Sequence, residues 1–100
     1  MSEHQRAKVL VNKSPIELNE FVESYFASVS IGIVKTLKGV DFIKKVEFHQ
    51  DKGEVTVKVN GNEISITQFP NDIIHSTLMG ILAPLKGFDK VEQLDVIVDA

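Results

Sequence analysis

The chain has 100 residues, of which 43% are hydrophobic and 25% charged, a balance typical of one globular domain and not of a disordered or fibrous chain. Its formal net charge of -3 argues against a protein that mainly neutralises nucleic-acid phosphates or coats an anionic membrane. It contains no cysteine, which excludes disulfides, thiolate nucleophiles and thiolate metal ligands together. We expect a single domain over residues 1–100, with residues 1–6 as a flexible tail.

The first predicted elements are a short strand at residues 7–11 and a long helix. Ser14-Pro15-Ile16-Glu17 is typical of a helix start, because Ser can cap, Pro fits the first helical position and Glu can complete a capping box. The helix is predicted to run to Gly39. An apolar stripe at three- and four-residue steps is expected to face the core: Leu18, Phe21, Val22, Tyr25, Phe26, Val29, Ile33 and Leu37.

Three short segments that follow show the period-two alternation of half-buried strands. Apolar residues alternate with polar ones around residues 46–49, 55–59 and 64–67. Gly53 suits the first connecting turn, and Asn60-Gly61 is a strong signal for a two-residue hairpin. We predict an antiparallel meander.

A second helix is predicted to open at Pro70-Asn71-Asp72 and to bend or end near Pro84, which cannot donate a helical hydrogen bond. Its inward stripe is expected to be Ile74, Leu78, Ile81, Leu82 and Leu85. The closing segment at residues 94–98 is almost continuously apolar, as in a strand that lies centrally in a sheet.

These elements predict an α+β fold with the order (β)-α-β-β-β-α-β. If the chain reverses direction at each connection, both helices point the same way and the last strand runs parallel to the first strand of the meander. We therefore expect both helices on one face of a single mixed sheet of four to five strands. In outline this resembles a ferredoxin-like plait, although the number of strands between the helices is odd.

Two octets share a pattern, GIVKTLKG at residues 32–39 and GILAPLKG at residues 80–87. Leucine, lysine and then glycine are favoured at any helix end, because Gly accepts the left-handed cap and Lys complements the helix dipole. That preference does not account for Gly32 and Gly80, which fall inside the predicted helices, where Gly costs roughly 1 kcal/mol relative to Ala. We expect close packing at both. Duplication of a unit and coincidence of two helix ends both stay open.

The first helix carries a second apolar row, formed by Ala27, Ile31 and Val34, nearly opposite its inward stripe. A helix that covers one face of a small sheet should be polar on that side. We expect this row to pack against another copy of the chain in a twofold dimer. The alternative is that the second helix covers the row within one protomer.

Lysines gather near the predicted helix tails and the strand starts that follow them. If both tails lie at one end, these lysines form a pole that could bind a small anionic ligand. The alternative is that lysines favour helix C-termini in any case and that nearby aspartates neutralise them. The residues are Lys35, Lys38, Lys44, Lys45, Lys86 and Lys90.

The histidines give little support for chemistry. Glu47 and His49 project from the same strand face at a spacing compatible with metal ligation, and equally ordinary for a solvated face. His75 follows Asp72 by three residues, which suits a hydrogen bond within the helix. The sequence has no GxGxxG, P-loop, HExxH or EF-hand pattern. We predict no catalytic residue, no cofactor and no metal.

The expected function is association: a small cytoplasmic, non-enzymatic domain that binds itself or another protein, as a homodimer or as an accessory subunit. No segment approaches the ~20 apolar residues of a membrane span, so no membrane partner is expected, and nucleic acid is disfavoured by the charge. Two alternatives are a ligand-sensing domain that uses the lysine pole and a small enzyme whose site is completed across a dimer interface.

Overall fold

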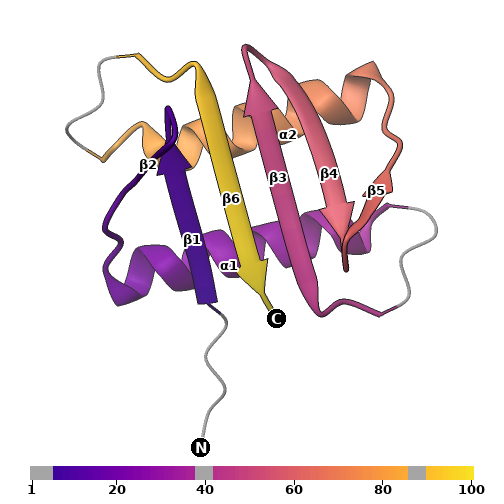
Figure 1. The fold of residues 1–100 in the computed structure, drawn as a ribbon, viewed down its shortest axis with the longest axis horizontal. Helices are drawn as coiled ribbons and strands as arrows, with labels where there is room; N and C mark the ends of the chain where they lie inside the picture. The colour runs from indigo at the N-terminus through magenta and orange to yellow at the C-terminus, as the bar shows by residue number, and fades with distance from the viewer. Residues whose placement is uncertain (1–5, 38–41, 86–89) are drawn as a thin grey trace, which may run out of the picture.

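The computed structural model describes residues 6–37, 42–85 and 90–100. It has two layers, a six-stranded sheet and two helices that cover one of its faces (Figure 1). The α+β class and the placement of both helices on one face are confirmed. The elements are β1 (Arg6–Val11), β2 (Ser14–Pro15), α1 (Glu20–Lys35), β3 (Lys45–Asp51), β4 (Glu54–Val59), β5 (Asn62–Ile64), α2 (Gln68–Leu82) and β6 (Gln93–Asp99).

The strand order is β2-β1-β6-β3-β4-β5, and every neighbouring pair is antiparallel. The predicted mixed sheet is therefore wrong, because β6 runs antiparallel to β3, with Phe48 opposite Val96. The sheet has six strands instead of four or five, and the ferredoxin-like outline is not confirmed. The early strand at residues 7–11 and the central position of the last strand are confirmed, since β6 lies between β1 and β3.

The direction of β6 was predicted wrongly because the directions of the two helices were predicted wrongly. Figure 1 shows that α1 and α2 cross the strands and run in opposite directions, whereas the prediction required them to point the same way. Near the start of α2, the Asn71 side chain bonds to the backbone of Gly53 and Val55 at 2.9 and 2.7 Å. The chain has thus returned to the beginning of β4 before α2 starts. As a result β6 departs from the same end of the sheet as β4.

The first helix begins later than predicted because Ser14 and Pro15 form β2, which pairs with the end of β1. Asn12 and Lys13 both have positive φ angles, 50° and 73°, as a tight two-residue hairpin requires. The N-cap of α1 is Asn19, whose Oδ1 accepts a hydrogen bond from the Val22 amide at 2.8 Å. Of the predicted tail, residues 1–5 lie outside the described residues and Arg6 opens β1.

The hydrophobic core lies between the helices and one face of the sheet. Its sheet side consists of alternate strand residues, and Phe48 at the centre is fully buried. On α2, Ile74, Leu78 and Leu82 are buried as predicted. On α1 the buried residues are Phe26, Ala27, Ser30, Ile31 and Val34.

The predicted inward stripe of α1 is therefore wrong in its direction. Phe21 and Tyr25 are 74% and 50% exposed, although Phe26 from the same stripe is buried. Ala27 and Ser30 are 0% exposed. The sheet-facing side of α1 therefore combines Phe26, Ile31 and Val34 with the small Ala27 and Ser30, whereas Phe21 and Tyr25 point away from the sheet.

The chain consists of two halves with the same order of elements, 48 residues apart. Arg6 and Glu54 open the first strands of the halves, and Lys45 and Gln93 open the last strands. Between them, α1 spans Glu20–Lys35 and α2 spans Gln68–Leu82. The described parts of the two octets, residues 32–37 and 80–85, occupy equivalent positions within this repeat, so their similarity is not explained by residue preferences at helix ends alone. The last two residues of each octet lie outside the described residues.

Hydrogen bonds show that an approximate twofold axis relates the halves. Oδ1 of Asn12 accepts from the Glu92 and Gln93 amides at 2.8 and 3.0 Å, and its Nδ2 donates to the Lys90 carbonyl at 2.7 Å. Asn60, 48 residues later, makes the reciprocal contacts with Lys44, Lys45 and Phe42 at 2.7, 2.9 and 2.6 Å. The axis passes through the central strand pair, where Phe48 faces its equivalent, Val96.

No helix in the described ranges is long and apolar enough to cross a bilayer.

Candidate functional site

The side of the helical layer that faces away from the sheet is the main candidate surface. Residues at three- and four-residue steps form one outward row on each helix, and we call the two rows together the outer helical face. Phe21 and Phe69 are 74% and 72% exposed there, and Tyr25 and Ile73 are 50% and 47% exposed. The outer helical face comprises Phe21, Tyr25, Ser28 and Gly32 on α1 and Phe69, Ile73, Ser76 and Gly80 on α2.

Two apolar hollows of about 490 and 530 Å³ lie along the line where the helices meet. The first lies between the beginning of α1 and the end of α2, and the second between the end of α1 and the beginning of α2. Eight of the nine lining residues of each hollow are equivalent under the 48-residue repeat. The first is lined by Phe21, Val22, Tyr25, Val29, Thr77, Gly80, Ile81, Pro84 and Leu85, and the second by Val29, Gly32, Ile33, Thr36, Leu37, Phe69, Pro70, Ile73 and Ile74.

The two helical glycines border these hollows and are not packed against the rest of the protomer. A Cβ atom added to Gly32 or Gly80 would have no heavy atom within 4 Å outside the local helix. The expected close packing at these glycines is therefore absent among the described residues of one chain. The space above both helices is open.

The predicted interface row is placed inside the protomer. Ala27 and Val34 are 0% exposed and Ile31 is 9% exposed, and all three belong to the core cluster. They cannot be the exposed row, because the first helix is rotated so that this side faces the sheet. The helix α1 does have two apolar sides, but the side that was predicted to be exposed is buried, and Phe21 and Tyr25 on the side that was predicted to be buried are exposed.

The predicted lysine pole does not form among the described lysines. In the central strand pair Lys45 at the start of β3 lies opposite Asp99 at the end of β6, so the starts of these strands are at opposite ends. Lys35 and Lys44 precede β3, whereas Lys90 precedes β6 and pairs with Glu92 at 3.3 Å. Helices that run in opposite directions separate the two tails. Lys38 and Lys86 lie outside the described residues.

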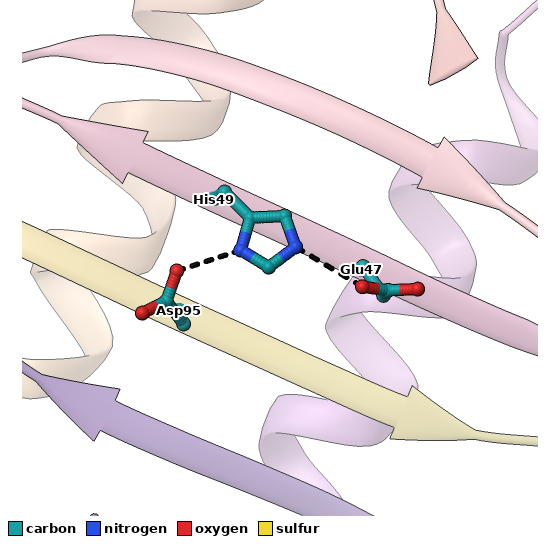
Figure 2. Close-up of polar contacts among 3 residues, drawn as sticks. All are labelled: Glu47, His49 and Asp95. Atoms are coloured by element: carbon teal, nitrogen blue, oxygen red, sulfur yellow. Dashed lines mark hydrogen bonds and ion pairs between the residues drawn. The ribbon is translucent and has the colours of Figure 1, made fainter. Parts of the chain in front are cut away.

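A second polar feature lies on the open face of the sheet, where His49 sits between two carboxylates (Figure 2). Its Nδ1 is 2.6 Å from Oδ1 of Asp95 on β6, and its Nε2 is 3.0 Å from Oε1 of Glu47 on β3. Glu47 and Asp95 are equivalent positions of the two halves, whereas the equivalent of His49 is Ile97. The sequence predicted that Glu47 and His49 share a face, but the contribution of Asp95 depends on the pairing of β3 with β6.

Both ring nitrogens of His49 are engaged within this cluster. Both ring nitrogens of His49 can donate at once only in the imidazolium form, and each then meets a carboxylate of the same chain. Neither nitrogen is free for a substrate or a metal, and the contacts join β3 to β6. Within the described ranges no group of three or more His, Cys, Asp or Glu residues is arranged to hold a metal.

The other described histidine also has a different partner from the one predicted. His75 Nδ1 lies 3.1 Å from Nε2 of Gln50, a buried side chain on β3. Asp72 instead accepts hydrogen bonds from Gln68 and Asn71. His75 therefore contributes to the contact between α2 and the sheet.

Sequence reasoning missed Phe69 and Ile73 as surface residues and assigned Phe21 and Tyr25 to the core. The signal that could have found them is the repeat itself. Aligned at the spacing of the octets, the two helices place Phe over Phe, Ser over Ser and Gly over Gly along one row.

No family model, no curated protein and no solved structure matches this chain.

Proposed function

We propose that the chain is a protein-association domain that docks through its outer helical face. The observation that carries the proposal is the exposure of four large apolar side chains on one face, beside two apolar hollows. Soluble monomers rarely expose contiguous apolar patches larger than a few hundred Å², and larger patches mark sites of interaction.

The composition of the face also suits protein association. The residues that line the two hollows carry no charge, and they include two phenylalanines and a tyrosine. Interface centres are depleted in charged residues and enriched in aromatic ones. The open face of the sheet carries polar side chains such as Glu47, His49 and Asp95, which supports a division between a docking side and a solvated side.

Affinity capture tests the proposal. The tagged full chain serves as bait in wild-type form and as the Phe21→Glu/Phe69→Glu double variant, against a cell extract and against a second copy that carries another tag. We expect the double variant to lose a captured protein at least about tenfold, because a charge would be buried in the contact. Circular dichroism checks that both baits are folded.

The matched control is Phe42→Glu. Phe42 is 66% exposed but lines neither hollow, so this variant adds the same charge elsewhere. It should capture what the wild type captures. If all three baits retain the same proteins, the outer helical face is not the docking site.

A further inference from the structure

Taking the outer helical face as the docking site, which is the premise of the proposed function, we infer that its partner is a second copy of this chain. The two copies meet helical layer to helical layer, which gives a four-layer homodimer with the sheets outside. Three features of the face favour this occupant over an unrelated protein.

The first feature is the symmetry of the surface. The outer helical face has an approximate twofold axis of its own, because α1 and α2 are equivalent elements in opposite directions (Figure 1). It presents two protruding phenylalanines and two hollows with equivalent linings. A second copy turned onto this face presents the same two phenylalanines and two hollows, so each copy can place its phenylalanines against the hollows of the other. Such an isologous contact is the usual basis of twofold dimers.

The second feature is the pattern of difference between the two halves. All five positions that α1 buries carry another residue in α2: Phe26/Ile74, Ala27/His75, Ser30/Leu78, Ile31/Met79 and Val34/Leu82. Five positions on the outer face and in the hollows are instead identical: Phe21/Phe69, Ser28/Ser76, Gly32/Gly80, Ile33/Ile81 and Leu37/Leu85. Four others there differ: Tyr25/Ile73, Val22/Pro70, Val29/Thr77 and Thr36/Pro84.

A core normally restricts change more than a surface does, and the strands follow this rule, since the buried pairs Val9/Val57 and Val11/Val59 are identical. In the helices the buried positions have changed and several outer positions have not, which one protomer alone does not explain. The core could repack as each half changed. Three of the four outer positions, Phe21/Phe69, Ser28/Ser76 and Gly32/Gly80, keep the same residue on both helices, although Phe21 and Phe69 are mostly exposed. A partner that contacts both helices in the same way, as a symmetric copy does, would impose that identity.

The third feature is the size and charge of the face. With about 150 to 250 Å² for each fully exposed aromatic side chain, the exposed fractions of Phe21, Tyr25, Phe69 and Ile73 correspond to on the order of 500 Å². The half-buried walls of the hollows add to this, toward the roughly 800 Å² per partner of a stable interface. Because the linings are uncharged, two chains of net charge -3 can meet here without like charges in contact.

Gly32 and Gly80 fit the same arrangement. Each leaves open space above its helix at the border of a hollow. Nothing in the protomer requires Gly there, and in a helix interior it costs about 1 kcal/mol relative to Ala. In the dimer both positions allow the partner's side chains to approach the helix backbone.

Sedimentation equilibrium of the full chain over roughly 1 to 200 μM tests the inference, since this range covers micromolar dissociation constants. The wild type and the Phe42→Glu control are expected to show the mass of two chains. The Phe21→Glu/Phe69→Glu variant is expected to show the mass of one chain, with a dissociation constant raised at least about 100-fold. Far-UV circular dichroism separates loss of association from loss of folding.

Spin labels give the geometry independently of these substitutions. The chain has no cysteine, so single Ser28→Cys and Lys58→Cys variants can each be labelled at one site. In the proposed dimer the Ser28 labels lie near the contact. The Lys58 labels lie on the outer faces, separated by about twice the 19 Å short dimension of the protomer.

The outcomes distinguish this inference from its premise. A wild-type mass of one chain at the highest concentration, with a captured protein that only the double variant loses, overturns the homodimer and keeps the docking face. A dimer that the double variant preserves, or one in which the Lys58 labels are the closer pair, overturns the homodimer through this face. If capture is also unchanged in the double variant, the docking face itself is overturned.

Discussion

At the residue scale, Asn12 and Asn60 tie the two halves of the molecule together. Each has a positive φ angle, 50° and 53°, and each side chain bonds to three backbone groups of the other half. Asn tolerates the left-handed region better than most residues, and its amide both donates and accepts. One residue thus closes a hairpin and holds the start of a distant strand.

We expect Asn60→Ala to lower the free energy of unfolding by about 2 kcal/mol and Asn60→Gly by about 1 kcal/mol. Both remove the three hydrogen bonds, but Ala also strains the left-handed backbone. Urea denaturation at low protein concentration measures the difference. Asn62→Ala, at an exposed position nearby, should change stability by less than ~0.5 kcal/mol. Equal stability of all four proteins would show that these contacts contribute nothing.

A second residue-scale prediction tests the rotation of α1. Val34→Ala should lower the free energy of unfolding by about 2 kcal/mol, because Val34 is fully buried. Phe21→Ala should change it by less than ~0.5 kcal/mol in the monomer, because Phe21 is 74% exposed. The midpoints of urea denaturation at low concentration measure both effects. The opposite order would mean that the larger stripe faces the core after all.

At the element scale, the two helices have an apolar inner face and an apolar outer face. An amphipathic helix on a sheet normally needs only one, so the outer face is surplus to the folding of a protomer. The glycines in this outer row weaken the helices without serving any contact in the protomer. Gly32 and Gly80 therefore lower the stability of the helices and in return leave the outer helical face open above the helix backbone.

Replacement of these glycines by alanine should change the stability of the monomer and its self-association in opposite directions. Gly32→Ala and Gly80→Ala should each raise the stability of the monomer by up to ~1 kcal/mol, because the added Cβ meets no atom within 4 Å. Thermal denaturation at low concentration gives this effect. The same variants should weaken self-association if the partner approaches the helices at these positions. A loss of monomer stability in either variant would contradict the open space above the helix.

At the scale of the whole molecule, the repeat makes the chain nearly cyclic. The end of β6 pairs with the start of β1, with Asp99 opposite Arg6. In the same way, Asp51 faces Glu54 across the two-residue turn that joins β3 to β4. The turn residues Lys52 and Gly53 both have positive φ angles, 51° and 91°. The two ends of the described chain lie where such a turn would fit.

A circular permutant tests this arrangement. Asp99 is joined to Arg6 by a Lys-Gly dipeptide, and the chain is opened between Lys52 and Gly53. We expect the native far-UV circular dichroism spectrum and a cooperative unfolding transition within about 2 kcal/mol of the original, because nearby ends tolerate permutation. A control opened inside α1, between Val29 and Ser30, should not fold. Failure of the first permutant to fold would contradict the near-cyclic arrangement.

The features of this fold that the sequence predicts are those set by residues close together along the chain, whereas contacts between distant segments are not predicted. The alternation in β3 and β4 and the turn at Asn60-Gly61 were predicted correctly, because each is set by neighbours along the chain. The inward stripe of α2 was predicted in part, since Ile74, Leu78 and Leu82 are buried but Ile81 and Leu85 line a hollow. The hairpin at Asn12-Lys13 was missed, since Ser14-Pro15 also suits a helix start. The cluster of His49 with Asp95 could not be seen in full, because it joins strands that are 46 residues apart.

By itself the sequence determined the α+β class, the two helices on one face of a sheet and the presence of two apolar sides on α1. Tertiary structure alone decided the antiparallel order of the strands and which side of α1 is buried. Both sides of that helix are apolar, so periodicity cannot rank them. The choice depends on how the side chains fit the sheet, where Phe26, Ala27 and Ser30 are fully buried while Phe21 and Tyr25 stay largely exposed.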